Sequence, residues 1–133
     1  MKGSYVIISS MKRRKAIIGK LGEIEFRDGY YAYVGSAMNS IEARIERHLR
    51  KNKKMRWHID YFLEHAKIEK IFYKEAIEKE ECWIAKNFAS IFESIPRFGA
   101  SDCKCKSHLF YSKNIEALKE MAKMLGMKEW NKN

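Results

Sequence analysis

The chain has 133 residues, with 27 Lys and Arg against 17 Asp and Glu, a formal net charge of +10 and a pI near 9.5. Such a basic excess makes a polyanion the first partner to consider. A chain of this length buries roughly two thirds of its unfolded surface, which is enough for one core but not for two. We therefore expect residues 1–133 to form a single small domain.

The apolar residues are too interrupted for a membrane protein. No run of about eighteen apolar residues occurs, and the short N-terminal apolar stretch soon meets the charges of residues 12–15. We expect neither a transmembrane helix nor a signal peptide, and no membrane partner. Three cysteines are an odd number, so we interpret them as reduced thiols or metal ligands of a cytoplasmic protein.

The first third of the chain has the composition of β-structure. Residues 5–8 and 16–18 are short β-prone runs, and residues 23–27 alternate between polar and apolar. Asp28-Gly29 is a strong hairpin-turn signal, and an aromatic strand follows it at residues 30–35. The pattern predicts an antiparallel hairpin that joins residues 23–27 to residues 30–35.

An amphipathic helix follows these strands. Asn39 is a candidate N-cap with Glu42 three residues later, and Ile41, Ile45 and Leu49 repeat every four residues. These three apolar side chains are expected to face the core.

The rest of the chain mixes both element types without a strict βαβ alternation, which indicates an α+β fold with a central, mainly antiparallel sheet flanked by α-helices. Pro96 opens a loop that contains cysteine and histidine, and this loop and a closing helix make up residues 96–126. The expected elements are helices over 56–65, 78–92 and 112–125, and strands over 68–73 and 108–111.

Half of the net positive charge lies in the predicted first helix and the loop that follows it. Seven Lys and Arg stand against two Glu between Glu42 and His58, a net charge of +5. Such a concentration favours a phosphate-binding face over an ordinary solvated helix. The residues predicted to contact nucleic acid are Arg47, Arg50, Lys51, Lys53, Lys54 and Arg56.

Arg44 and His48 stand four residues apart and therefore share a helix face. A guanidinium can stabilise charge on a phosphodiester, and an imidazole beside it can transfer a proton near neutral pH. On pattern alone, Arg44 could equally be an ordinary surface arginine.

Glu81 shares a helix stripe with Ile84, Ala85, Phe88 and Phe92. A carboxylate on an apolar face is usually paired or bound to metal, so Glu81 is either a ligand for a hard divalent cation or the partner of an arginine. The neighbouring Glu80 is the alternative, because its stripe is nearly as apolar.

The segment 102–108 contains Asp102, two cysteines and a histidine. A C-x-C spacing departs from the C-x2–4-C spacing of most structural zinc sites, so a loop that shields the site or binds substrate is favoured over zinc. The candidate ligands of a structural metal are Cys82, Cys103, Cys105 and His108.

Taken in order, these features resemble the GIY-YIG endonuclease family. Ser4-Tyr5-Val6, then Tyr33-Val34-Gly35-Ser36-Ala37, then the helix with Arg44 and His48, then a lone downstream glutamate, are similar to the motifs of that family. The small stand-alone Uri-type branch is the closer match, and its later segments resemble Arg56 to Tyr61, Glu81-Cys82 and Phe98 to Tyr111. The interval from Tyr5 to Tyr33 is longer than in the compact family core, so an extra strand or hairpin is expected over residues 15–27.

The resemblance implies a one-metal phosphodiesterase. Its catalytic residues would be Tyr5, Tyr33, Arg44, His48 and Glu81, and Glu81 would be the single ligand of Mg²⁺ or Mn²⁺. Water would be the nucleophile and Tyr5 or Tyr33 its base, activated by the metal and Arg44, with His48 assisting.

We therefore expect a metal-dependent endonuclease that hydrolyses DNA, including branched or structured DNA of the kind handled in repair or recombination. The alternative is a nucleic-acid-binding module that keeps the fold and the basic face without catalysis. The sequence leaves RNA open as a second substrate, and a monomer or weak homodimer is expected.

Overall fold

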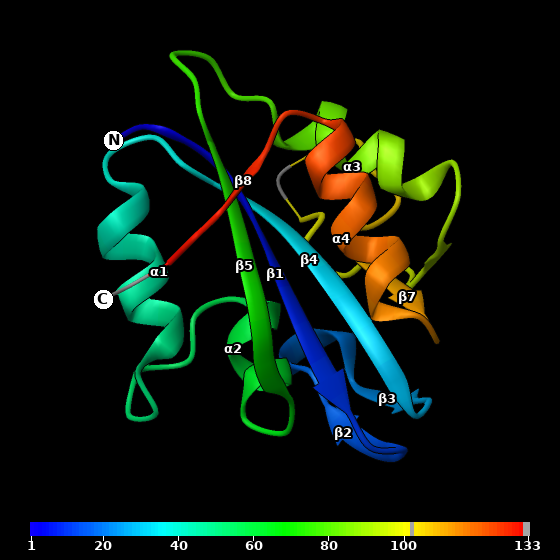
Figure 1. Cartoon of the computed structure of the whole chain (residues 1–133). Coiled ribbons are helices and arrows are strands. Elements are labelled where there is room, and N and C mark those ends of the chain that lie inside the picture. The colour runs from blue at the N-terminus through cyan, green and yellow to red at the C-terminus, as the bar shows by residue number, and fades with distance from the viewer. Residues whose placement is uncertain (102, 132–133) are drawn as a thin grey trace.

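The computed structural model describes residues 1–101 and 103–131, and its described part is a six-stranded antiparallel sheet with four α-helices (Figure 1). This confirms the expected α+β class. The order in the sheet is β6-β7-β4-β1-β5-β8. The strands of this sheet are β1 (Gly3–Met11), β4 (Gly29–Ala37), β5 (Lys67–Glu75), β6 (Glu93–Ser94), β7 (Leu109–Ser112) and β8 (Lys128–Glu129), and the helices are α1 (Ile41–Leu49), α2 (His58–Leu63), α3 (Glu81–Ala89) and α4 (Ile115–Met124).

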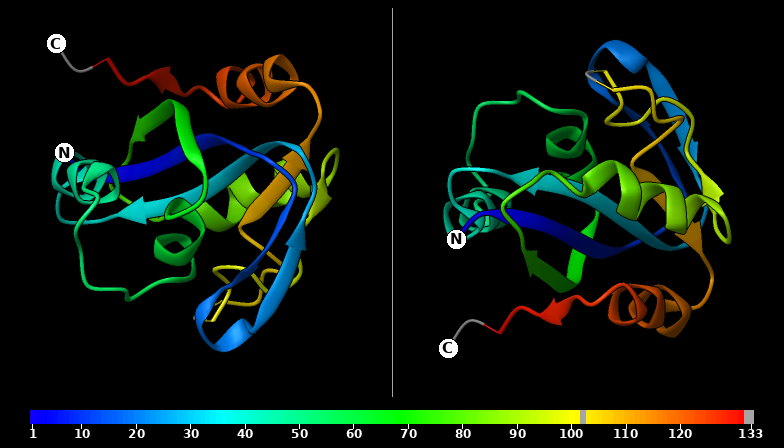
Figure 2. Two further views of the ribbon diagram at one scale, coloured as in Figure 1. Left: turned by 90° about the horizontal axis from the view of Figure 1, so that it is seen from below. Right: turned by 90° about the horizontal axis from the view of Figure 1, so that it is seen from above.

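Side chains alternate across the sheet and divide the core between its two faces. Val6 and Ile8 of β1 point to the face that α3 and α4 cover. Tyr5 and Ile7 point to the opposite face, where they pack with α1. Figure 2 shows α2 and α4 on opposite sides of the sheet and α1 at one end. The face under α1 is the one that carries the two tyrosines singled out from the sequence.

The predicted hairpin between residues 23–27 and 30–35 is wrong. Residues 23–26 form β3 (Glu23–Phe26), which pairs with β2 (Arg14–Ile17), and β4 pairs with β1. The pairings are nested, so β1 to β4 form one long antiparallel ribbon whose tip is the short 3-10 helix η1 (Gly19–Leu21).

The Asp28-Gly29 pair lies where this ribbon bends, rather than at its tip. Gly29 has a φ of 147°, and a β-carbon there would lie 2.7 Å from the Tyr111 ring. The Tyr111 hydroxyl donates to the Asp28 carbonyl at 2.7 Å. Glycine is therefore required at position 29 because an aromatic ring lies against the backbone. The β2–β3 extension is the additional ribbon that the long Tyr5 to Tyr33 interval predicted.

The N-cap of helix α1 lies one residue later than predicted. Ser40, and not Asn39, is the N-cap, and its hydroxyl accepts from the Ala43 amide at 3.1 Å. The helix buries His48, whereas Leu49 is 43% exposed and does not join the core. The core face of α1 therefore contains His48, whose burial could not be predicted from residue polarity alone.

Helix α3 is shorter than the predicted 78–92 and begins at Glu81. Ile84, Ala85 and Phe88 are buried as expected, but Glu81 lies in the first turn and its side chain is 24% exposed.

Asp102 lies outside the described residues. No helix in the described part of the chain is long and apolar enough to span a bilayer.

Candidate active site

The two tyrosines of the central strands meet the buried histidine of α1. Tyr5 lies on β1 directly opposite Gly35 of β4, and its hydroxyl is 2.7 Å from His48 Nε2. The Tyr33 ring centroid lies 6.3 Å from that of Tyr5 and 6.2 Å from that of His48. Three of the residues predicted from the sequence thus form one aromatic cluster.

Gly35 makes room for this cluster. A β-carbon at position 35 would lie 2.5 Å from both Cζ and Oη of Tyr5. The phenol ring of Tyr5 therefore lies directly over the β4 backbone, and only glycine allows this approach. The Tyr-Val-Gly sequence thus has a steric role at its third position.

The environment of the cluster keeps the shared proton on Tyr5. Burial raises the pKa of Tyr5, and the nearby Arg44 guanidinium opposes that shift. Burial, and then the positive charge of Lys53, lowers the pKa of His48 to about 3. At neutral pH the pair consists of a protonated phenol and a neutral imidazole. His48 Nδ1 is buried and has no hydrogen-bond partner among the described residues.

Arg44 is held between a backbone carbonyl and an indole. Its Nη1 donates to the Ser36 carbonyl at 3.1 Å, and its guanidinium lies 4.5 Å from the centre of the Trp57 ring. Arg44 is partly buried. The described contacts leave N–H groups of this guanidinium able to donate to an oxyanion, because a guanidinium carries five of them.

Glu81 is connected to Arg44 through a single residue. The Ser36 hydroxyl donates to Glu81 Oε1 at 3.0 Å, while the Ser36 carbonyl accepts from Arg44. Glu81 Oε2 lies 3.6 Å from Nδ1 of His108. Glu80, the alternative candidate, forms an ion pair with Lys74 at 3.0 Å instead. The structure therefore brings Glu81, rather than Glu80, beside Arg44.

The Glu81 carboxylate has the properties of a hard-cation ligand. It is partly exposed, and the described residues give it one hydrogen bond, from Ser36, so lone pairs remain on both oxygens. Mg²⁺ commonly takes one or two carboxylates and keeps several waters. The residues present thus fit a single divalent ion held by Glu81.

Arg47 and Lys53, two of the predicted nucleic-acid contacts, are engaged within the fold. Arg47 forms a bidentate pair with the buried Asp60, at 2.8 and 2.9 Å. Lys53 Nζ donates to the carbonyls of Arg47 and His48 at 3.2 and 2.8 Å, at the end of α1. Both cations therefore already have partners, and their contact with nucleic acid stays a prediction.

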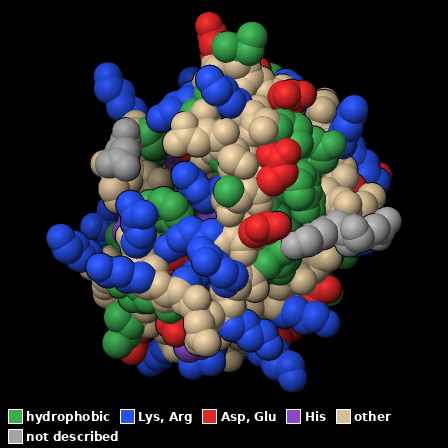
Figure 3. All heavy atoms as spheres, turned by 90° about the vertical axis from the view of Figure 1, so that its left-hand side faces the viewer, with side chains coloured by type: hydrophobic (Ala, Val, Ile, Leu, Met, Phe, Trp, Pro, Cys, Tyr) green, Lys and Arg blue, Asp and Glu red, His purple; other side chains and the backbone are tan. Residues whose placement is uncertain are grey.

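The other four members of the predicted set are exposed. Figure 3 looks onto the side of α1, and Lys and Arg side chains gather over the centre and left of this face. Arg56 of this set and Arg44 lie over the same indole, with their guanidinium groups 5.3 and 4.5 Å from the centre of the Trp57 ring. The exposed members of the predicted set are Arg50, Lys51, Lys54 and Arg56.

The three cysteines lie close together, and one of them, Cys82, is the residue after Glu81. Cys82 follows Glu81 on α3, and Cys103 and Cys105 lie on the loop before β7. Burial, and then hydrogen bonds with the two other thiols, raises the pKa of the Cys105 thiol to about 12. The candidate ligand atoms of Cys82, Cys103, Cys105 and His108 all lie within 4.8 Å of one another.

Two residues of the site were not assigned a role from the sequence. Ser36 links Arg44 to Glu81, and Trp57 lies within 4.5 Å of the guanidinium groups of Arg44 and Arg47. The serine stands next to Gly35, and the tryptophan follows a basic run. Neither position has a spacing that predicts these contacts, because both depend on how α1 docks on the sheet.

The fold and the site together define a small α+β domain with a polar cluster beside a basic face. The chain belongs to the family described as a domain of unknown function, DUF123, which it matches over residues 4–129. No match was found among curated proteins or among solved structures.

Proposed function

We propose that this protein is a metal-dependent endonuclease of the GIY-YIG type that hydrolyses phosphodiester bonds in DNA. The observation that carries the proposal is that Tyr5, Tyr33 and His48 contact one another while Ser36 connects Arg44 to Glu81. A module that only binds nucleic acid needs neither a buried tyrosine–histidine pair nor a carboxylate beside the phosphate-binding arginine.

Each group has a defined task in this proposal. Arg44 donates to the nonbridging oxygens of the scissile phosphate, where negative charge develops. A divalent ion held by Glu81 would act as Lewis acid on the phosphate and stabilise the leaving oxygen. Ser36 connects Arg44 to Glu81, and the Trp57 ring lies against the Arg44 guanidinium.

The tyrosine–histidine pair provides a route for the proton of the attacking water. Water transfers a proton toward the phenol oxygen of Tyr5 as Tyr5 transfers its own proton to His48 Nε2, 2.7 Å away. In the free protein the low pKa of His48 disfavours this transfer. A bound phosphodiester brings negative charge close to His48 and raises that pKa, so proton transfer is coupled to substrate binding.

The test is cleavage of defined DNA by the purified protein. Branched, single-stranded and duplex oligonucleotides are incubated with Mg²⁺, Mn²⁺ or EDTA, and binding is measured in parallel. We expect metal-dependent cleavage that falls at least about a hundredfold in the Arg44→Lys variant, because lysine lacks the planar fork. Intact substrate under all conditions, with salt-sensitive binding retained, would replace the enzyme by the binding module.

A further inference from the structure

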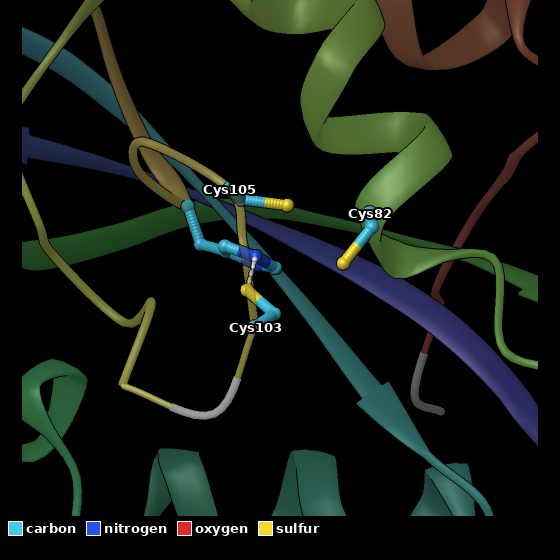
Figure 4. A group of neighbouring side chains, drawn as sticks. Cys82, Cys103 and Cys105 are labelled. Atoms are coloured by element: carbon cyan, nitrogen blue, oxygen red, sulfur yellow. Dashed lines mark hydrogen bonds between the residues drawn. The ribbon is translucent and has the colours of Figure 1, made fainter.

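The cysteine–histidine cluster is built from two segments that lie far apart in the chain. Figure 4 shows the Cys82 sulfur projecting from the first turn of α3 toward Cys103 and Cys105 on the loop that precedes β7. Arg97 N donates to Lys106 O and His108 N donates to Phe98 O near the ends of this loop, and Gly99 N donates to His58 Nδ1 of α2 at 2.9 Å. A bond across the cluster would join this loop to α3.

His108 is oriented as a metal-binding histidine should be. It is 1% exposed, and its Nδ1 lies 3.0 Å from the Val34 carbonyl, which can only accept. Nδ1 therefore carries the proton, and the Nε2 lone pair faces Cys103 Sγ at 3.2 Å. Ligating histidines commonly donate their other ring N–H to a carbonyl or carboxylate, which fixes the tautomer. The side chain is thus preorganised for a ligand at Nε2.

The chemistry and spacing of the four groups select a soft, tetrahedral cation. Three sulfurs and one imidazole form a Cys3His set, a common donor set of structural zinc. Zn–S bonds of about 2.3 Å hold tetrahedral ligand atoms about 3.8 Å apart. The present separations, all within 4.8 Å, require shifts of only about 1 Å. Three thiols so close to one another have no comparable explanation as core residues, since Cys82 is exposed and the other two are partly exposed.

We propose that Cys82, Cys103, Cys105 and His108 bind one Zn²⁺ as a structural centre that fixes the loop before β7 against the first turn of α3. Binding converts three thiols to thiolates and releases three protons, and the neutral imidazole contributes its Nε2 lone pair. The C-x-C spacing that argued against zinc in the sequence is accommodated because the fourth ligand position is filled by Cys82, from α3.

The zinc centre also orients the candidate catalytic glutamate. Cys82 is the residue after Glu81, and His108 Nδ1 lies 3.6 Å from Glu81 Oε2. Metal bound at Cys82 and His108 therefore restrains the Glu81 carboxylate from two sides. This second role rests on the proposed function, whereas zinc binding itself does not.

Metal content is the direct test. Protein purified without chelator is dialysed and analysed by elemental mass spectrometry, and we expect about one zinc per chain. In a second measurement, Co²⁺ is added to metal-free protein of the natural sequence. Tetrahedral thiolate coordination gives intense charge-transfer bands and visible d–d bands, with about one equivalent bound. Absence of zinc together with absence of these bands would overturn the proposal, as would oxidation of two cysteines to a disulfide in the freshly purified protein.

Variants separate the zinc centre from catalysis. Cys82→Ser and Cys105→Ser should each lower zinc affinity at least about tenfold. Glu81→Gln should retain zinc fully while losing cleavage, because its carboxylate is not a zinc ligand. Unchanged zinc affinity in both cysteine variants, measured by competition with a chelator, would contradict the assignment. Full zinc content in a natural chain that does not cleave DNA would leave the zinc centre standing and refute only the nuclease.

Discussion

At the scale of single residues, the pairing of Tyr5 with His48 determines how the site is protonated. The sequence could show that both residues belong to a recognisable pattern, but their 2.7 Å contact depends on α1 turning His48, and not Leu49, into the sheet. The helical periodicity of apolar residues predicted that Leu49 faces the core. Such a pattern considers only the polarity of each side chain, so it could not include the Tyr5 hydroxyl, the partner of His48 on the sheet.

Acid should destabilise the protein through His48. The folded state binds the His48 proton only near pH 3, whereas an unfolded histidine binds it near pH 6.5, so the unfolded state binds more protons between these values. Stability therefore falls as pH falls through this window, by about 3 kcal/mol between pH 7 and 4.5 from this group alone. Urea unfolding of the His48→Gln variant should show a loss smaller by that amount. Parallel pH curves for both proteins would contradict the assigned pKa.

At the scale of elements, the long ribbon and the close approach of β1 to β4 position the site. Local signals predicted most strands and helices of the chain. The predicted pairing of β3 with β4 was wrong, because Asp-Gly occurs both in hairpin turns and in bends such as the one at Asp28-Gly29. The two-residue strands β6 and β8 were not predicted, because segments this short have no periodicity of their own.

Gly35→Ala tests the approach of the two central strands. The new methyl group would lie 2.5 Å from the Tyr5 hydroxyl and ring, so the phenol must move away from His48. We expect a stability loss of about 1–3 kcal/mol, as for other overpacked sites, and a larger fall in cleavage than in DNA binding. Thermal unfolding and cleavage rates measure the two effects. A variant with natural activity would show that Tyr5 does not need its observed position.

Arg47→Ala tests the Arg47–Asp60 ion pair that joins α1 to α2. Burial alone would raise the pKa of Asp60, but hydrogen bonds from Arg47 and two backbone amides lower it to about 2, so Asp60 is ionised at neutral pH. Arg47→Ala therefore leaves a buried carboxylate without its cationic partner. Loss of a buried partner costs about 3–5 kcal/mol. Arg50→Ala removes an exposed cation and should change stability by less than about 0.5 kcal/mol. Equal unfolding midpoints for the two variants would contradict the structural role of Arg47.

At the scale of the whole molecule, half of the basic excess belongs to the segment 42–58, which also contains Arg44 and His48. Composition alone indicated a polyanionic partner, and the structure separates the cations of the 42–58 segment into those engaged in the fold and those exposed. That division could not be predicted, because Arg47 and Arg50 are three residues apart in the sequence, whereas only Arg47 meets Asp60 of α2 and Arg50 is the exposed C-cap of α1.

The exposed cations should dominate the salt dependence of DNA binding. Each phosphate contact contributes about 0.9 to the slope of log affinity against log salt. A triple variant, Arg50→Ala with Lys51→Ala and Lys54→Ala, should therefore lower this slope by up to about 3. The control changes three exposed lysines on the side of α3 and α4, Lys86, Lys113 and Lys123, to alanine, and should leave the slope nearly unchanged. Equal slopes for the two triple variants would place the DNA elsewhere.

The central claim is that Glu81, held by Ser36 beside Arg44, supports hydrolysis of a DNA phosphodiester. Its most direct test compares metal-dependent cleavage by the natural chain, Glu81→Gln and the adjacent Glu80→Gln at equal DNA occupancy. Cleavage should fall at least about a hundredfold in Glu81→Gln, with DNA affinity retained, and stay within about threefold of the natural rate in Glu80→Gln. Undiminished cleavage by Glu81→Gln would contradict the account.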